Sequence, residues 1–131
     1  MNILVCGGRD YTDKETLTRL LSNLKTSLAS KGTPIDVLVQ GEAAGADRLA
    51  KEWAVSNGVH CAGVPALWNQ YGRGAGHARN NAMLFLNIGL VVAFPGGRGT
   101  GNMVAQAKRA AIPVWVISES EDDIWELLLN E

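Results

Sequence analysis

Short apolar runs alternate with longer segments of helical spacing along the chain. The runs have the length and composition of strands that are buried on both faces of a sheet. Predicted strands cover Asn2 to Cys6, Asp36 to Gln40, Val59 to Val64, Leu90 to Phe94 and Pro113 to Ile117. The alternation of strand and helix predicts an α/β protein with a parallel sheet.

Between the strands, apolar residues recur every three or four positions, which is typical of amphipathic helices. Thr12 and Glu15 have the spacing of a capping box at the start of the first helix, which ends near Gly32. We expect Gly89 to end the fourth helix before the next strand. The other predicted helices run from about Asp47 to Gly58, Ala78 to Asn87, Thr100 to Ala111 and Asp122 to Leu129.

The order of the strands decides where the loops lie. Right-handed crossovers place the carboxyl ends of all parallel strands at one edge of the sheet. With the order 3-2-1-4-5, the first and fourth strands are neighbours at the point where the connections change direction. At 131 residues the chain has the length of one domain. We therefore expect residues 1–131 to form a single Rossmann-like, three-layer α/β sandwich with five parallel strands.

Glycine-rich loops follow the first, second and fourth predicted strands. A loop of this kind before a helix exposes backbone amides at the positive end of the helix dipole, which favours a phosphate. A tight turn that needs glycine for its backbone angles alone is the structural alternative. The loop after the fourth strand combines three glycines, an arginine and a hydroxyl, which makes anion binding the better interpretation there. The predicted ligand-binding residues of the three loops are Gly7, Gly8 and Arg9, then Gly41 and Gly45, then Gly96, Gly97, Arg98, Gly99 and Thr100.

The segment after the third strand, residues 66–77, is long and rich in glycine, and long loops in compact domains are often functional. Its aromatic residues Trp68 and Tyr71 are predicted to stack on a nucleotide base, although they could instead cover the core. Arg79 and Asn80 follow near the start of a helix. We expect Arg79 to contact phosphate rather than to lie on the free surface of that helix.

Four titratable residues near the proposed crevice are candidates for catalysis. These are Asp10, Glu42, Asp47 and His77. Asp47 lies at the start of a helix, where carboxylates are usually caps, so capping ranks ahead of a contact to ribose. The carboxylates of Asp10 and Glu42 could equally be exposed to solvent or form an ion pair with an arginine instead of taking part in catalysis.

Composition and charge exclude several classes of protein. Apolar residues make up 47% of the chain and charged residues 19%, as in globular proteins. The net charge of −1 provides no general attraction to nucleic acid or to an anionic membrane. The first apolar run is too short for a signal peptide or a membrane span, so we expect a cytoplasmic protein with Cys6 and Cys61 reduced.

Familiar cofactor motifs are absent from the sequence. The first loop is not GxGxxG, and the second strand ends in Gln40 rather than in an acid that would hold a ribose. There is no Gly-Lys-Ser/Thr of a P-loop and no Cys/His spacing of a zinc site. We expect no metal and no resident cofactor.

The loop motifs together resemble one family, the YspA-type branch of the SLOG superfamily, over nearly the whole chain. The motifs that carry the resemblance are Cys6-Gly7-Gly8-Arg9-Asp10, Gly41-x-x-x-Gly45-Ala46-Asp47, Trp68-x-x-Tyr71-Gly72, Ala75-Gly76-x-x-Arg79-Asn80-x-x-Met83 and Phe94-Pro95-Gly96-Gly97-Arg98-Gly99-Thr100. The resemblance implies a Rossmann-like nucleotide-binding domain, related to the LOG phosphoribohydrolases and to the core of DprA. It also implies a homo-oligomer, because LOG relatives share residues across a dimer interface.

Two functions from different classes follow from this resemblance. The first is binding of a nucleotide or derivative such as AMP, ADP-ribose or NAD, with a role as a sensor. The second is hydrolysis of an N-glycosidic bond, as in LOG enzymes. Met103 occupies the position of the LOG catalytic glutamate and cannot carry a proton, which favours binding. Binding of single-stranded DNA, as in DprA relatives, fits poorly with the net charge.

Overall fold

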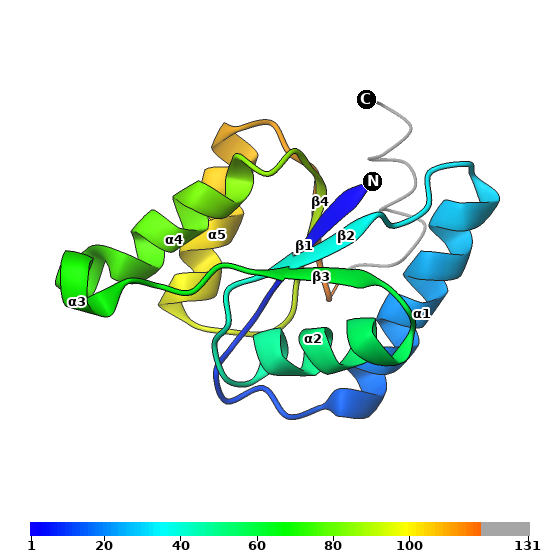
Figure 1. Ribbon diagram of the computed structural model, residues 1–131, viewed down its shortest axis with the longest axis horizontal. Helices are drawn as coiled ribbons and strands as arrows, with labels where there is room; N and C mark the ends of the chain where they lie inside the picture. Colours follow the sequence, from blue (N-terminus) through cyan, green and yellow to red (C-terminus); the bar gives the residue numbers. More distant parts are fainter. Residues whose placement is uncertain (119–131) are drawn as a thin grey trace.

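In the computed structural model, which describes residues 1–118, parallel strands form a sheet that is covered by helices (Figure 1). The strands are β1 (Asn2–Cys6), β2 (Val37–Gln40), β3 (His60–Gly63), β4 (Ile88–Ala93) and β5 (Val114–Val116). The helices are α1 (Lys14–Ser30), α2 (Ala46–Ser56), α3 (Trp68–Tyr71), the 3-10 turn η1 (Gly72–Gly74), α4 (Ala75–Leu84) and α5 (Arg98–Arg109). The sheet has five strands in the order β3-β2-β1-β4-β5, and every pair is parallel. The predicted fold class and strand order are therefore confirmed.

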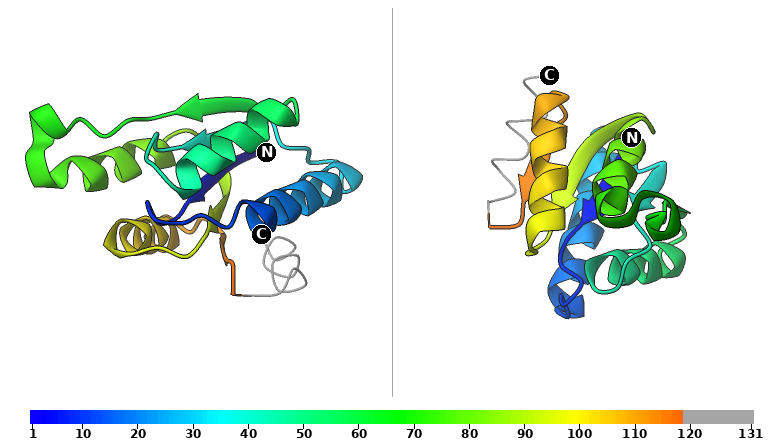
Figure 2. Two further views of the ribbon diagram at one scale, coloured as in Figure 1. Left: turned by 90° about the horizontal axis from the view of Figure 1, so that it is seen from below. Right: turned by 90° about the vertical axis from the view of Figure 1, so that its left-hand side faces the viewer.

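Each strand contributes side chains to a hydrophobic core on both faces of the sheet. Ile3 and Val5 of β1 pack in the core that contains α1 and α2, whereas Leu4 and Cys6 pack in the core that contains α4 and α5. The views of Figure 2 show these two helical layers with the sheet between them. Among residues 1–118, no helix combines the length and apolar character needed to cross a membrane.

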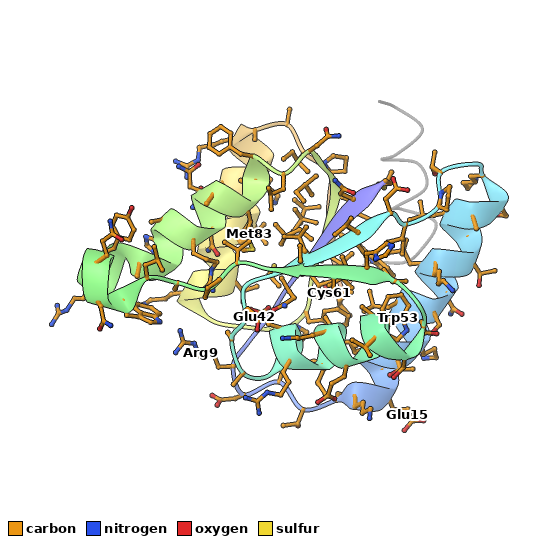
Figure 3. The ribbon with its side chains drawn as sticks, viewed as in Figure 1. Arg9, Glu15, Glu42, Trp53, Cys61 and Met83 are labelled. Carbon is orange, nitrogen blue, oxygen red and sulfur yellow. The ribbon has the colours of Figure 1, made fainter. Side chains whose placement is uncertain are left out.

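The two helices of the first layer are also joined by a polar contact. Trp53 of α2 is 3% exposed and lies between α2 and α1 (Figure 3). Its indole N–H donates a hydrogen bond to the Ser22 hydroxyl of α1 at 3.0 Å. This bond satisfies the polar atom of a large buried side chain, as buried tryptophans require.

Several boundaries differ from the sequence prediction. The first helix is capped by Asp13, whose carboxylate accepts a hydrogen bond from the Thr16 backbone N–H at 3.1 Å. The capping box of Thr12 and Glu15 is therefore wrong, because the helix begins one residue later than that box requires. Gly89 is inside β4, where the register against β1 shifts, and does not end the preceding helix.

The glycine-rich segment after β3 is more helical than its composition suggested. It contains α3 and η1, and α4 begins at Ala75, three residues before the predicted start at Ala78. Likewise α5 begins at Arg98 rather than at Thr100. The predicted helix from Asp122 to Leu129 and Trp125 lie outside the described residues.

The loop before α2 packs directly against the loop after β1. Gly45, the N-cap of α2, has a positive φ of 75°. A side chain at Gly45 would overlap the backbone oxygens of Gly8 and Arg9. Glycine is thus required at this position both for its backbone conformation and for the close approach of the two loops.

Replacing Gly45 by alanine should destabilise the protein more than the same change at another left-handed glycine. Gly58 also has a positive φ, but a side chain there would meet no atom of the described residues within 4 Å. We expect Gly58→Ala to lower the free energy of unfolding by about 1–2 kcal/mol through backbone strain alone. Gly45→Ala should lower it by about 1–3 kcal/mol more, because the methyl group meets backbone atoms.

Urea denaturation of the wild type and of the two variants measures both values. Equal losses of stability in Gly45→Ala and Gly58→Ala would contradict the packing that we describe for Gly45.

Candidate functional site

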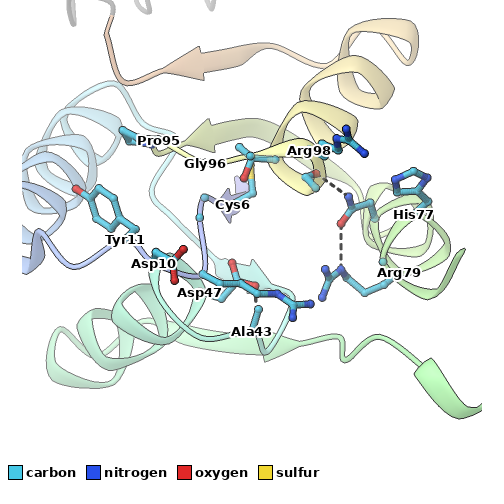
Figure 4. Close-up of a pocket in the computed structure, with 18 of the residues that line it drawn as sticks. Cys6, Asp10, Tyr11, Ala43, Asp47, His77, Arg79, Pro95, Gly96 and Arg98 are labelled. Atoms are coloured by element: carbon cyan, nitrogen blue, oxygen red, sulfur yellow. Dashed lines mark hydrogen bonds between the residues drawn. The ribbon is translucent and has the colours of Figure 1, made fainter. Parts of the chain in front are cut away.

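A pocket of about 950 Å³ opens at the carboxyl edge of the sheet, where the connections from β1 and β4 leave in opposite directions (Figure 4). All four loops that the sequence assigned to this edge contribute to its wall. The lining comes from residues 6–13, Ala43, Asp47, Trp68, Arg73, Gly76, His77, Arg79, Asn80, Met83 and residues 95–100. Ligands of open parallel sheets bind at this kind of position.

The glycine loops after β1 and β4 are joined by their backbones. The Gly8 N–H donates a hydrogen bond to the Pro95 carbonyl at 2.9 Å. The Gly8 carbonyl in turn accepts bonds from the N–H groups of Tyr11, at 3.2 Å, and Ala46, at 3.1 Å. The two glycine loops that follow these neighbouring strands therefore face each other, and the loop before α2 joins them.

Most glycines of these loops are needed for packing between the loops. A side chain at Gly7 would overlap the Cβ atoms of Ala46 and Phe94, and one at Gly96 would overlap Thr100 and the Gly8 nitrogen. A side chain at Gly41 would overlap the Arg79 guanidinium. These positions are thus explained by close contacts within the protein itself.

Glycines in the first turn of α5 have no such explanation. Side chains at Gly97, Gly99 and Gly101 would meet no atom within 4 Å beyond their own turn, as far as the described residues extend. Gly97 is the N-cap of α5, and the described part of the chain provides no side-chain hydrogen bond to cap this helix. The Gly101 N–H donates to the Gly97 carbonyl at 3.0 Å, whereas the N–H groups of Arg98, Gly99 and Thr100 are available to a ligand in the pocket, next to the exposed side chain of Arg98.

Asp47 lies in the pocket wall and holds the loop after β2. One oxygen of its carboxylate, Oδ2, accepts hydrogen bonds from the N–H groups of Gly41 and Ala43, each at 3.2 Å. The side chain is 6% exposed, and burial raises the pKa of Asp47 above its ordinary value. The two amides and the charge of Arg79 oppose this rise in pKa. Asp47 therefore does not cap α2, whose N-cap Gly45 has no side-chain hydrogen bond; it holds the loop after β2 instead and also faces the pocket.

Arg79 extends from α4 across the pocket toward the same loop. Its Nη1 donates a hydrogen bond to the Gly41 carbonyl at 2.6 Å, and its Nε donates to Asn80 Oδ1 at 3.0 Å. Asn80 is 5% exposed and donates from Nδ2 to the Gly99 carbonyl at 3.2 Å and to Asn102 Oδ1 at 3.1 Å. Asn80 therefore links Arg79 to the first turn of α5 (dashed lines in Figure 4).

Arg9 and Trp68 form a contact at the mouth of the pocket. The Arg9 guanidinium carbon lies 5.4 Å from the centre of the Trp68 ring, which is within the range of a cation–π interaction. Trp68 is 48% exposed, so its ring is partly open to solvent. The contact brings α3 and the loop after β1 together on one side of the pocket.

Charge is unevenly distributed around the pocket. Arg79, Arg98 and His77 lie on the side formed by α4 and α5, whereas Asp10 and Tyr11 lie on the opposite side (Figure 4). Burial raises the pKa of the Tyr11 hydroxyl, and the charge of Asp13 raises it further. Arg79 and Arg98 therefore offer cationic donors on one side of the pocket, and Asp10 and Tyr11 offer oxygen atoms on the other.

Glu42 points away from this pocket, toward α2 (Figure 3). Its carboxylate accepts hydrogen bonds from Gln40 Nε2 at 2.7 Å and from Lys51 Nζ at 3.1 and 3.2 Å. These bonds, that of Gln40 first, hold the pKa of Glu42 below its ordinary value. Glu42 has a positive φ of 58°.

Cys6 lies in the pocket wall, and Met103 lies in the hydrophobic core on the same face of the sheet. Burial, with a further contribution from Asp47, raises the pKa of the Cys6 thiol to about 12. The thiol is therefore protonated at neutral pH and is a poor nucleophile. Met103 is fully buried and packs in the core between the sheet and α5.

Most of the predicted site residues come together in the pocket wall. They are Gly7, Gly8, Arg9, Asp10, Asp47, Trp68, His77, Arg79, Asn80, Gly96, Gly97, Arg98, Gly99 and Thr100. Gly41, Gly45, Glu42 and Tyr71 lie outside the pocket wall. Gly41 and Gly45 shape the loop that leads into α2, the helix that carries Asp47, and Tyr71 is 52% exposed on α3.

Sequence reasoning missed several residues of the wall. From the sequence, Cys6 is expected only to be reduced, and no role is predicted for Tyr11, Arg73 or Met83. Tyr11 directly follows the first loop motif, so its position was a usable signal. Arg73 lies in the segment whose helical structure was not predicted, and nothing local marks it.

Comparison with known proteins agrees with the resemblance found in the sequence. The Gene 61 protein of Mycobacterium phage D29 is 33% identical over 121 residues, which cover 86% of this chain and 92% of the relative. No solved structure matches the chain significantly. Residues 1–71 match the family described as "YspA, cpYpsA-related SLOG family", a membership that is consistent with nucleotide-related binding or processing. These residues include the first two glycine loops and Trp68, and the chain belongs to this YspA, cpYpsA-related SLOG family.

Proposed function

We propose that this chain binds a phosphorylated nucleoside in the pocket, with a phosphate on the amides at the start of α5. The observation that carries the proposal is the composition of the first turn. Gly99 and Gly101 each cost a helix about 1 kcal/mol relative to alanine, and neither is needed for a close contact within the described residues. Room for a ligand against the backbone explains glycine at Gly99, which lies in the pocket wall.

The position of Arg98 supports the same proposal. A cation at the N-terminus of a helix is unfavourable, because the helix dipole places positive charge there. Arg98 is the first residue of α5 and lies in the pocket wall. A bound phosphate turns this repulsion into attraction, because both the amides and the guanidinium then face an anion.

The rest of the pocket suits a nucleoside. Its volume of about 950 Å³ is in the range of small-molecule sites. Trp68 offers a partly exposed ring for stacking on a base, and the carboxylates of Asp10 and Asp47 can accept hydrogen bonds from ribose hydroxyls. AMP, ADP-ribose and NAD are the ligands to test, and a binding protein of this kind can act as a sensor of nucleotide status.

Hydrolysis of an N-glycosidic bond is the second candidate function. Its support is Asp47, a buried carboxylate in the pocket wall whose raised pKa brings it closer to the range of a general acid. Asp10 and His77 also lie in the pocket wall, whereas Glu42 faces α2. The burial of Met103 favours binding, because the position of the LOG glutamate then lies in the core.

Replacing Gly99 by alanine should stabilise the free protein and weaken binding. We expect the free energy of unfolding to rise by up to about 1 kcal/mol, because alanine is the better helix former. The affinity for AMP should fall by about tenfold or more, because the methyl group separates the phosphate from the amides. Thermal denaturation and calorimetric titration with AMP measure the two effects.

Gly101→Ala is the matched control for this experiment. Gly101 is in the same helix, is exposed and lies outside the pocket wall. The Gly101→Ala variant should stabilise the free protein while leaving the affinity for AMP unchanged. If Gly99→Ala bound AMP as tightly as Gly101→Ala, the phosphate would not lie at this turn.

Removing the charge of Arg98 should also weaken binding. We expect Arg98→Ala to lose about tenfold or more in affinity for AMP, because a charge-assisted hydrogen bond is worth about 1.5–3 kcal/mol. Arg109→Ala removes the same charge from the opposite end of α5 and should bind AMP like the wild type. An equal loss in both variants would indicate a long-range effect of charge, not a contact.

Product analysis distinguishes binding from hydrolysis. The protein is mixed with AMP, ADP-ribose, NAD and a cytokinin riboside monophosphate, and each mixture is analysed for free base or nicotinamide. A ligand at about a hundred times its dissociation constant adds about 2.7 kcal/mol of stability, which raises the melting temperature. We expect stabilisation without products. Base release that is lost in Asp47→Asn or Asp10→Asn would instead establish the hydrolase.

A further inference from the structure

Arg9 and Arg79 converge on the pocket from different elements. Arg9 follows β1, Arg79 belongs to α4, and both lie in the pocket wall. They are close enough for the charge of Arg9 to lower the pKa of Arg79, although burial is the larger cause of that shift. Like charges that are brought together in this way repel each other.

Neither guanidinium forms an ion pair with an acid of the described residues. The ion pairs in this part of the chain join Met1 to Asp36 and Lys51 to Glu42. Asp47 acts on Arg79 through its charge, but it lies beyond ion-pair distance, and the amides of Gly41 and Ala43 occupy one of its oxygens.

Neutral contacts hold the two arginines in place instead. The face of the Trp68 ring supports Arg9, and the Gly41 carbonyl and the Asn80 side chain fix Arg79. Arg79 donates through Nε and Nη1, so its Nη2 donors are left for a ligand. The guanidinium of Arg9 has no hydrogen bond within the described residues, so all of its donors are left as well.

Asn80 connects this pair to the start of α5. Its Oδ1 accepts the bond from Arg79 Nε, and its Nδ2 donates to the Gly99 carbonyl. Asn102 Oδ1 accepts a further hydrogen bond from Asn80 Nδ2. Asn102 Oδ1 also accepts a bond from Gln106 Nε2 at 2.7 Å, so the side-chain amide of Asn80 is part of a larger network. A single buried side-chain amide thus sets the spacing between Arg79 and the first turn of α5.

We infer that Arg9 and Arg79 form a second anion subsite beside the α5 terminus, so that the pocket takes a ligand with two linked anionic groups, a nucleoside diphosphate or its derivative. The inference rests on the proposed function and refines it. One phosphate lies on the amides of α5 with Arg98, and the next lies between Arg9 and Arg79. The bound anion neutralises the repulsion between the two guanidinium groups and satisfies their remaining donors.

Binding of AMP and of ADP without metal ions tests this inference. We expect the wild type to bind ADP about tenfold more tightly than AMP or better, because the second phosphate gains charge-assisted bonds. Arg9→Gln should remove most of this preference and change the affinity for AMP by less than about twofold. Arg9 is exposed and has no hydrogen bond to lose among the described residues, so this variant should fold normally.

Two further variants separate the subsites. Arg98→Ala should weaken AMP and ADP alike, because it affects the first phosphate and leaves the ratio of the two affinities unchanged. Arg48→Gln removes an exposed arginine of α2 outside this pocket and should leave both affinities and their ratio unchanged. Equal affinities for AMP and ADP in the wild type would overturn the inference, as would an Arg9→Gln variant that weakens both nucleotides equally.

The failure of this inference can be told apart from the failure of the proposed function. If AMP and ADP bind equally tightly, the proposed function stands and the second subsite falls. If no nucleotide binds, the proposed function falls, and inorganic pyrophosphate is compared with inorganic phosphate. Tighter binding of pyrophosphate that depends on Arg9 would then support the second subsite alone, and equal binding of the two would overturn it.

Discussion

The backbone hydrogen bond from Gly8 to Pro95 holds the candidate site together. It joins the loops after β1 and β4 at the centre of the sheet, and the Gly8 carbonyl also receives the amide of Ala46 at the start of α2. Backbones approach this closely because Gly7 and Gly45 carry no side chains. Three strand ends and two helix starts thereby form one rigid wall around the pocket. Flexible loops would give the arginines no fixed relation to the amides of α5.

The pocket wall brings several cationic side chains together. The chain as a whole is nearly neutral, with a net charge of −1, so the cationic groups in the pocket reflect local placement and not general composition. Arg98 opposes the dipole of its helix, and Arg9 and Arg79 repel each other. These arrangements are unfavourable in the free protein and become favourable around an anion.

Several side chains in and around the pocket are poorly suited to covalent chemistry. The pKa of the Cys6 thiol, about 12, keeps it protonated, and Met103 brings no titratable group into the core. Glu42 is held on the far side of its loop by Lys51. Asp47 combines burial with a position in the pocket wall, although two backbone amides already occupy one of its oxygens. This chemistry favours the proposed binding of a nucleotide over the second candidate function, hydrolysis.

The sequence by itself determined which segments form strands and which loops follow them, and it predicted the order of the sheet that the structure shows. Hydrophobic periodicity is a local property of the chain, and right-handed crossovers leave few ways to connect buried parallel strands. Only the tertiary structure decided what each loop residue does. Gly45 and Gly99 look alike in the sequence, yet one fits against a distant backbone and the other borders the pocket. Likewise Lys51 holds the Glu42 carboxylate outside the pocket wall, whereas Asp47 lies in that wall. Such roles depend on contacts between residues far apart in the chain, which no local pattern contains.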